Sequence, residues 1–230
     1  MIGVMVPSIF AEISITDDST GGDCTTIGTW DSASKTCTLT SDISDSIVIN
    51  SDGIILDGND HTINVDLLEG NNPVIASYDN NNVIITNFKI SCTPGGGGSA
   101  FPSSPNSYAC HKPGIVSNNG ENIIISNNHI TNLLNHYIQV SYGSPLDNLF
   151  VGGEIYGNIL EKPDWSLNSS WSPAIFAWAN GVKVYDNVFD HFGMSISVCR
   201  DAKIFENTFK NNHWVIDKIP SSQDCGTDDD

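Results

Sequence analysis

The sequence predicts an all-β solenoid in which short parallel strands stack in successive coils. A motif made of a Val- and Ile-rich strand, a polar pair and a closing apolar residue recurs along most of the chain. A second short apolar stretch precedes each copy, and no helical periodicity is long enough to supply crossover helices. Because one coil cannot bury its own apolar face, stacked coils explain this fixed order better than a hairpin-based sandwich does.

The motif occurs in six segments that keep the same order of residue types. Strand alternation directs the second and fourth residues of each copy into the core, for example Ile54 and Leu56 in the first copy. In the fourth copy these residues are Leu149 and Val151. The copies are 53–63, 82–90, 122–130, 148–155, 181–189 and 201–209. The additional apolar stretches are 47–49, 74–76, 115–116, 138–140, 174–178, 195–198 and 214–216.

Asparagine is frequent, with 25 residues in the chain. Asn59, Asn128, Asn187 and Asn207 lie in the polar pairs of four copies, so we expect them at one turn of successive coils. Amides stacked at the strand spacing of about 4.7–4.9 Å can bond one another as a ladder. Asparagine also tolerates the left-handed backbone of tight corners.

The segments SNNHI, YDNVF and FENTF resemble the repeats of the pectin-lyase-like superfamily. The resemblance covers residues 47–219 and implies a right-handed parallel β-helix of about six to seven coils, as the handedness rule for parallel crossovers also favours. The stretch CTTIGTWDSASKTCTL resembles the disulfide-closed N-terminal cap of extracellular members, some of them archaeal. The superfamily includes pectate lyases, polygalacturonases, uronan epimerases, phage tailspikes and non-catalytic surface proteins.

Several features favour a secreted or cell-surface protein. The apolar run at the start resembles the end of a signal peptide, and Asn168 begins a glycosylation sequon. No later stretch is apolar for long enough to span a membrane. We expect a signal-peptide-like segment at 1–11, a cap at 12–46, the β-helix at 47–219 with insertions at 91–113 and 156–173, and an acidic tail at 220–230.

The six cysteines lack the spacing of a zinc site, which favours disulfides. Among the possible pairings, we favour neighbours in the sequence because each such pair brackets a loop-like stretch. The expected disulfides are Cys24–Cys37, Cys92–Cys110 and Cys199–Cys225.

The charge balance restricts the classes of partner. Nine Lys and Arg against 27 Asp and Glu give a net charge of −18 in 230 residues. Binding to nucleic acid or to an anionic membrane needs clustered cations, so neither is expected. Neutral sugars, other proteins or Ca²⁺ suit this surface better. No metal site or other cofactor is indicated by motif, and Ca²⁺ stays open as an alternative.

The clearest candidate binding residues are aromatic. Trp165, Trp171 and Trp178 lie close together in the sequence, and Tyr156 precedes them. Flat aromatic faces beside carboxylates and amides suit pyranose rings. The alternative is a loop that uses tryptophan to attach itself to the solenoid wall.

The motifs of the enzymes in the superfamily are absent, so catalytic candidates are few. Arg200 with Asp201 is the one place for an arginine-based lyase arrangement, and the alternative is a surface ion pair. Glu161 and Asp164 could form the carboxylate pair of a glycoside hydrolase.

Histidines form another candidate group, because His136, His191 and His213 each follow a closing apolar residue. His191 lies beside Asp190, and such corners could support acid–base catalysis if they were in register. Their offsets from the closing residues differ, which favours separate, solvated histidines.

The outward position of the motif is apolar in four copies: Ile55, Ile84, Ile124 and Phe150. This stripe is either covered by the 91–113 insertion or a contact face for another copy or a neighbouring protein. The sequence thus favours a polysaccharide-binding surface protein. Its alternatives are a polysaccharide lyase, epimerase or glycoside hydrolase, and a non-catalytic structural or adhesive element.

Overall fold

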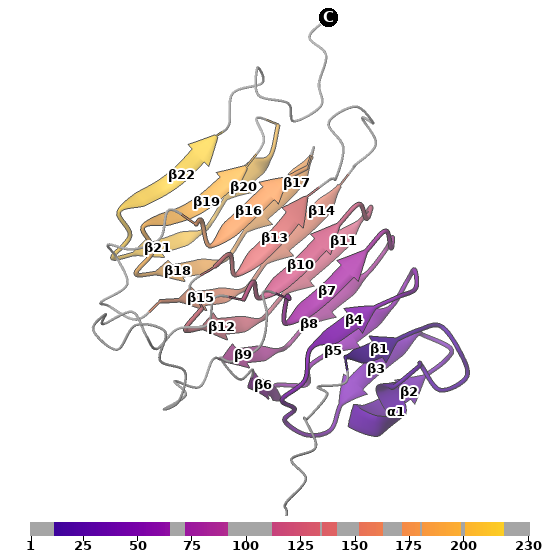
Figure 1. Cartoon of the computed structure of the whole chain (residues 1–230). Helices are drawn as coiled ribbons and strands as arrows, with labels where there is room; N and C mark the ends of the chain where they lie inside the picture. The colour runs from indigo at the N-terminus through magenta and orange to yellow at the C-terminus, as the bar shows by residue number, and fades with distance from the viewer. Residues whose placement is uncertain are drawn as a thin grey trace, which may run out of the picture.

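The computed structural model describes residues 12–64, 72–91, 112–133, 135–141, 152–162, 172–179, 181–198 and 201–218. These residues form mainly short strands, which build three sheets. The chain visits sheet A, sheet B and sheet C in turn and then returns to sheet A at the next level. Figure 1 shows the resulting stack, from the indigo strands near the N-terminus to the yellow β22. The predicted all-β fold with long parallel sheets is confirmed.

Sheet A contains β1 (Ile13–Ile15), β4 (Ile47–Ile49), β7 (Ile75–Tyr78), β10 (Ile115–Asn118), β13 (Ile138–Ser141), β16 (Ile175–Trp178), β19 (Met194–Val198) and β22 (Trp214–Lys218). Sheet B contains β2 (Gly28–Asp31), β3 (Thr36–Leu39), β5 (Ile55–Asp57), β8 (Ile84–Thr86), β11 (Ile123–Ser126), β14 (Gly153–Tyr156), β17 (Val182–Tyr185) and β20 (Lys203–Phe205). Sheet C contains β6 (Thr62–Asn64), β9 (Lys89–Ser91), β12 (His129–Thr131), β15 (Ile159–Glu161), β18 (Val188–Asp190) and β21 (Thr208–Lys210).

Columns of identical side chains build the core. In sheet A, parallel register places one isoleucine of each strand directly above that of the strand before. Burying one such side chain contributes about 1.5–3 kcal/mol, and only stacking can bury all of them. The buried column comprises Ile13, Ile47, Ile75, Ile115, Ile138, Ile175 and Ile196.

Residue pairs make the corner between sheets B and C in successive circuits. Their first residues have a left-handed backbone, with φ of 55° at Asn127 and 67° at Gly157. Asn and Gly tolerate this conformation better than other residues do. The pairs are 87–88, 127–128, 157–158, 186–187 and 206–207.

In the last four of these pairs the second residue is asparagine, and these asparagines form a ladder that contains three of the predicted members, Asn128, Asn187 and Asn207, together with Asn158, which was not predicted. Asn128 Nδ2 donates to Asn158 Oδ1 at 3.0 Å, and Asn158 Nδ2 donates to Asn187 Oδ1 at 2.9 Å. Asn187 Nδ2 continues the series to Asn207 Oδ1 at 3.0 Å. The expected member Asn59 instead donates to the Leu39 carbonyl at 3.3 Å.

The fourth motif copy lies later in the chain than the sequence indicated. Its sheet B strand is β14, in which Gly153 pairs with Ile123 and Ile155 pairs with Ile125. The predicted inward residues Leu149 and Val151 precede this strand and lie outside the described residues. The expected insertion at 156–173 is also shorter, because β15 occupies Ile159–Glu161 within it.

The N-terminal cap closes one end of the stack. β1 and β3 belong to sheets A and B, whereas β2 pairs antiparallel with β3 and begins sheet B. The disulfide Cys24–Cys37, with 5.7 Å between the Cα atoms, ties the short helix α1 (Cys24–Ile27) to β3. This predicted disulfide is confirmed. The other four cysteines, Cys92, Cys110, Cys199 and Cys225, lie outside the described residues.

Candidate functional site on sheet A

Long stretches of the chain leave β13 and enter β16. Residues 162–174 lead from sheet C into β16, and residues 142–152 lead from β13 to sheet B. The corner between sheets B and C holds only short connections. In repeat proteins, insertions gather on one face, which is often the binding face. This part of sheet A is therefore the candidate site.

Aromatic side chains cover β16 on this face. Strand alternation places Phe176 and Trp178 on the same outer side, with their ring centroids 5.6 Å apart. The His136 ring stacks on Phe176 at 5.2 Å and 21°, and its Nδ1 donates to the Pro173 carbonyl at 3.1 Å. Trp178 keeps 38% of its surface exposed. The result is an apolar surface that is partly open to solvent.

Burial lowers the pKa of His136, and the positive charge of Lys162 acts in the same direction. The hydrogen bond to Pro173 opposes both effects. The depressed pKa keeps the ring largely neutral at pH 7, so it packs on Phe176 as a flat, weakly polar surface.

The neighbouring strand β13 supplies polar groups. Gln139 is the register partner of Phe176, and Ser141 is the partner of Trp178. Gln139 Nε2 lies 3.3 Å from Ser141 Oγ, which donates to Asn118 Oδ1 at 2.6 Å. We name Phe176, Trp178, Gln139 and Ser141 the sheet A platform. It combines ring faces with amide and hydroxyl groups, as sugar-binding surfaces do.

A buried lysine, Lys162, follows β15 directly and begins the 162–174 connection; its charge acts on His136, the ring that stacks on Phe176. Lys162 is 5% exposed, and its Nζ lies 5.3 Å from the centroid of the Phe192 ring. Burial lowers the pKa of this lysine to about 8. Tyr137, fully buried next to it in the chain's core, donates its hydroxyl to the Glu161 carbonyl at 2.7 Å.

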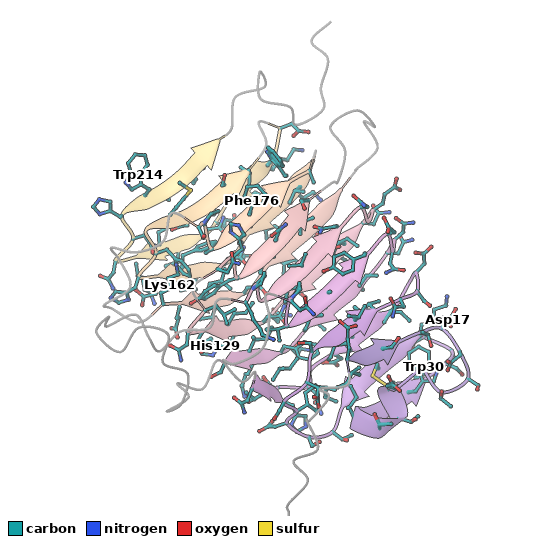
Figure 2. The ribbon with its side chains drawn as sticks, in the orientation of Figure 1. Asp17, Trp30, His129, Lys162, Phe176 and Trp214 are labelled. Atoms are coloured by element: carbon teal, nitrogen blue, oxygen red, sulfur yellow. A yellow bond between two sulfur atoms is a disulfide. The ribbon has the colours of Figure 1, made fainter. Side chains whose placement is uncertain are left out.

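Acidic and imidazole groups gather on the outer side of sheet C. Glu161 and Asp190 are register partners on β15 and β18. His129 Nε2 lies 3.0 Å from Glu161 Oε2, and His191 Nδ1 lies 2.8 Å from Asp190 Oδ1. The structure thus brings together the predicted candidates Glu161, Asp190 and His191, and adds His129. Figure 2 shows His129 and Lys162 on the sheet C side and Phe176 on β16.

Other predicted residues lie elsewhere. Asp201 accepts a hydrogen bond from the Gly181 backbone at 2.8 Å in an exposed turn between sheets A and B. Trp165, Trp171, Asp164 and Arg200 lie outside the described residues. The structure therefore describes neither the Arg200–Asp201 pair nor the Glu161–Asp164 pair.

Tyr156 lies on sheet B, away from the sheet A platform. Its ring stacks on Tyr185 at 5.0 Å and 11°, and Tyr185 stacks on Phe205 at 4.9 Å and 3°. Tyr185 donates its hydroxyl to Glu154 Oε2 at 2.9 Å; desolvation and then this bond raise the pKa of Tyr185 to about 12. Stacking covers the ring faces between neighbours, so the column offers mainly ring edges to a ligand.

The predicted apolar stripe on sheet B is present in part. Ile55, Ile84 and Ile124 are register partners, and all three are half-buried. The next residue in this column is Glu154, whereas Phe150 precedes β14 and lies outside the described residues. Glu154 binds Lys183 Nζ at 2.7 Å, so the column continues as a charged surface.

Sequence reasoning missed Phe176, Gln139, Lys162 and His129 as site residues. The signal for Phe176 was its position two residues before Trp178 on a predicted strand, since such residues share a face. Within the described ranges, no group of three or more His, Cys, Asp or Glu is arranged to hold a metal ion. The helix that the structure describes is too short and polar to cross a membrane. Comparisons with models of known families, with curated proteins and with solved structures found no match.

Proposed function

We propose that the protein is a secreted or cell-surface protein that binds polysaccharide on the sheet A platform. The observation that carries this proposal is the pairing of an aromatic strand, with Phe176 and Trp178, and a polar strand, with Gln139 and Ser141. Indole and phenyl faces pack against the C–H face of a pyranose, and amide and hydroxyl groups bond its hydroxyls.

The surrounding chain supports the same proposal. Residues 162–174, which lead into β16, contain Trp165 and Trp171 in the sequence. Stacked parallel strands give an extended wall, which suits a polymeric ligand. The net charge of −18 favours a neutral polysaccharide over a uronan, since a polyanion would be repelled unless Ca²⁺ bridged the charges.

We further propose that the solenoid is a right-handed parallel β-helix of about six to seven coils, of the pectin-lyase-like type. The recurring motif, the parallel register of the three sheets after the antiparallel β2–β3 pair, and the disulfide-bonded cap support this assignment. This fold assignment does not imply that the protein catalyses the reactions of the superfamily's enzymes, because a fold alone does not imply an activity.

A second candidate function is cleavage of the bound polysaccharide by the sheet C cluster. Glu161 and Asp190 are adjacent carboxylates, and each lies within hydrogen-bond distance of an imidazole. One carboxylic acid and one carboxylate are the usual requirement for glycoside hydrolysis, and histidine can act as acid or base.

Incubation of the disulfide-intact protein with neutral and uronate polysaccharides, with and without Ca²⁺, separates these functions. The proposal predicts that the protein is retained by at least one neutral polysaccharide and releases no new chain ends. New reducing or unsaturated ends would favour the sheet C cluster as an active site. If the protein is not retained and releases no new ends, both candidate functions are contradicted. A structural or adhesive surface element then remains.

A further inference from the structure

Two tyrosines lie side by side on the outer wall of sheet B. Tyr156 on β14 and Tyr185 on β17 are register partners in neighbouring circuits. Their rings are stacked, with centroids 5.0 Å apart and an angle of 11° between the ring planes. Both side chains are half-buried, so each keeps some contact with solvent. Because neighbouring strands have a fixed spacing of about 4.7–4.9 Å, the fold itself holds the two phenol rings in contact.

The neighbours of this pair in the same column carry no phenol. Phe205 follows Tyr185, with ring centroids 4.9 Å apart and an angle of 3° between the planes. Ser126 is the register partner of Tyr156 on the other side. Within the described residues, a radical formed on either tyrosine therefore has the phenol of the other tyrosine as its one partner in ring contact.

A carboxylate is placed to take the phenol proton of Tyr185. The Tyr185 hydroxyl donates to Glu154 Oε2 at 2.9 Å, and Lys183 Nζ donates to Glu154 Oε1 at 2.7 Å. The bond from Lys183 and then that from Tyr185 hold the pKa of Glu154 below its usual range, so this carboxylate is ionised at neutral pH. A phenol that loses an electron becomes a strong acid, and a carboxylate at hydrogen-bond distance accepts its proton.

The other tyrosines that the structure describes lack this arrangement. Tyr137 is fully buried, and its hydroxyl donates to the Glu161 carbonyl at 2.7 Å. Tyr78 is 43% exposed, but its register partner in the next circuit is Asn118. Contact between two phenols is thus specific to sheet B within the described ranges.

We propose that Tyr156 and Tyr185 are a site of oxidative cross-linking, at which hydrogen peroxide and a peroxidase join them as dityrosine. Each tyrosine gives up one electron and its phenolic proton, that of Tyr185 to Glu154 and that of Tyr156 to water. The two radicals then form a carbon–carbon bond between ring carbons next to the hydroxyl groups, and the hydrogens of these carbons return to the phenol oxygens through solvent. One hydrogen peroxide takes up the two electrons and two protons and becomes two molecules of water.

The cross-link acts on the structure as a covalent clamp between circuits. It encloses residues 157–184, which make one complete circuit through β15 and β16. Its formation needs only rotation of the two side chains, because strand register already fixes the two backbones. A bond that closes a loop restricts the unfolded chain and so stabilises the folded one. This modification does not depend on polysaccharide binding.

Treatment of the dilute, disulfide-intact chain with a peroxidase and hydrogen peroxide tests the cross-link. The expected product is a single chain that is lighter by two hydrogen atoms and has the blue fluorescence of dityrosine. Peptide mapping is expected to join the peptides that contain Tyr156 and Tyr185. Tyr156→Phe and Tyr185→Phe each keep a ring at the same place but remove one phenol, so neither variant is expected to form this product. Circular dichroism establishes that each variant keeps its β structure.

Tyr78→Phe is the matched control. Tyr78 is more exposed than either member of the pair, but it lies on sheet A with no tyrosine as its register partner. This variant is expected to form the Tyr156–Tyr185 product like the wild type. A wild-type chain that yields no peptide joining these two tyrosines, or loss of that peptide in Tyr78→Phe, would overturn the proposal.

Glu154→Gln tests the proton acceptor. The amide oxygen still accepts the hydrogen bond of Tyr185 but does not take up its proton. The initial rate of cross-linking should therefore fall, while the mapped product stays the same. An initial rate equal to that of the wild type would contradict the role of Glu154.

Discussion

Asn158 donates its side-chain amide to Asn187 Oδ1 at 2.9 Å, from one circuit of the solenoid to the next. The same amide group donates to the Ile125 and Tyr156 carbonyls, at 3.0 and 3.1 Å. Asn158 is fully buried, so one side chain satisfies several backbone and side-chain groups that water does not reach. The ladder therefore fixes the register of the sheets as well as the shape of the corner.

Asn158→Ala should destabilise the protein by about 3 kcal/mol, because buried partners such as the Ile125 carbonyl lose a hydrogen bond. Denaturant unfolding measures the change in free energy. Asn50→Ala serves as the control, since Asn50 is exposed and bonds only Ser14 Oγ among the contacts described for its side chain. The control should cost less than about 1 kcal/mol. Equal losses in the two variants would contradict a special role of the ladder.

Much of the fold follows from the sequence because the repeat encodes it many times. A column such as Ile123, Gly153 and Val182 requires one inward-facing residue at the same position of each circuit. The corner between sheets B and C requires one asparagine in each circuit. The fourth copy was assigned to the wrong register because the run Leu149–Phe150–Val151 looks more apolar than the strand that contains Gly153. Glycine is accepted at this inward site because the neighbouring circuits bury it, which no local pattern reveals.

The candidate site was harder to predict. Trp178 stood out by composition, but its grouping with Tyr156 followed closeness in sequence, and the two residues lie on different sheets. Gln139 belongs to the platform only because β13 pairs with β16. Likewise, Glu161 and Asp190 are 29 positions apart and meet through the register of β15 and β18. Pairing between circuits depends on the lengths of the connections, which the motif does not encode.

The cap disulfide should contribute about 3 kcal/mol, as expected for a bond that closes a loop of 13 residues. Replacing Cys24 and Cys37 together by alanine should therefore loosen the cap before the rest of the solenoid. Hydrogen exchange should show faster exchange in β1, β2 and β3 than in β10 and β11. Uniform exchange across all of these strands would contradict a local role of the bond.

The pairing of the remaining cysteines can be read by mass spectrometry of a non-reduced digest. We expect cross-linked peptides that join Cys92 to Cys110 and Cys199 to Cys225, as the confirmed Cys24–Cys37 pair of sequence neighbours suggests. A peptide that joins Cys110 to Cys199, or free thiols at these positions, would show that neighbour pairing fails beyond the cap.

Lys162 should make stability depend on pH in the alkaline range. Burial lowers its pKa from 10.5 to about 8, so between these values the unfolded chain binds a proton that the folded chain does not. The free energy of unfolding should therefore rise as the pH increases from 8 to 10.5. Below pH 8 Lys162 is protonated in both the folded and the unfolded chain, so the folded protein bears the full free-energy cost of burying the charge.

Lys162→Met should remove this dependence and stabilise the protein at pH 7 by on the order of 2–3 kcal/mol. Thermal and denaturant unfolding at several pH values measure both effects. Lys183→Met, which removes the lysine bonded to Glu154 on the outer wall, should change stability by less than about 1 kcal/mol. If the free energy of unfolding of the Lys162→Met variant still rises between pH 8 and 10.5, groups other than Lys162 cause the rise.

The most direct test of the central claim compares Trp178→Ala with Tyr78→Ala in retention by the neutral polysaccharide that binds the wild-type protein best. Tyr78 lies in the same column of sheet A and is 43% exposed, but it belongs to β7, three strands before the β16 strand that carries Trp178. We expect Trp178→Ala to weaken retention about ten-fold with little change in stability, and Tyr78→Ala to bind like the wild type. Equal retention of the two variants would place any polysaccharide binding outside the sheet A platform.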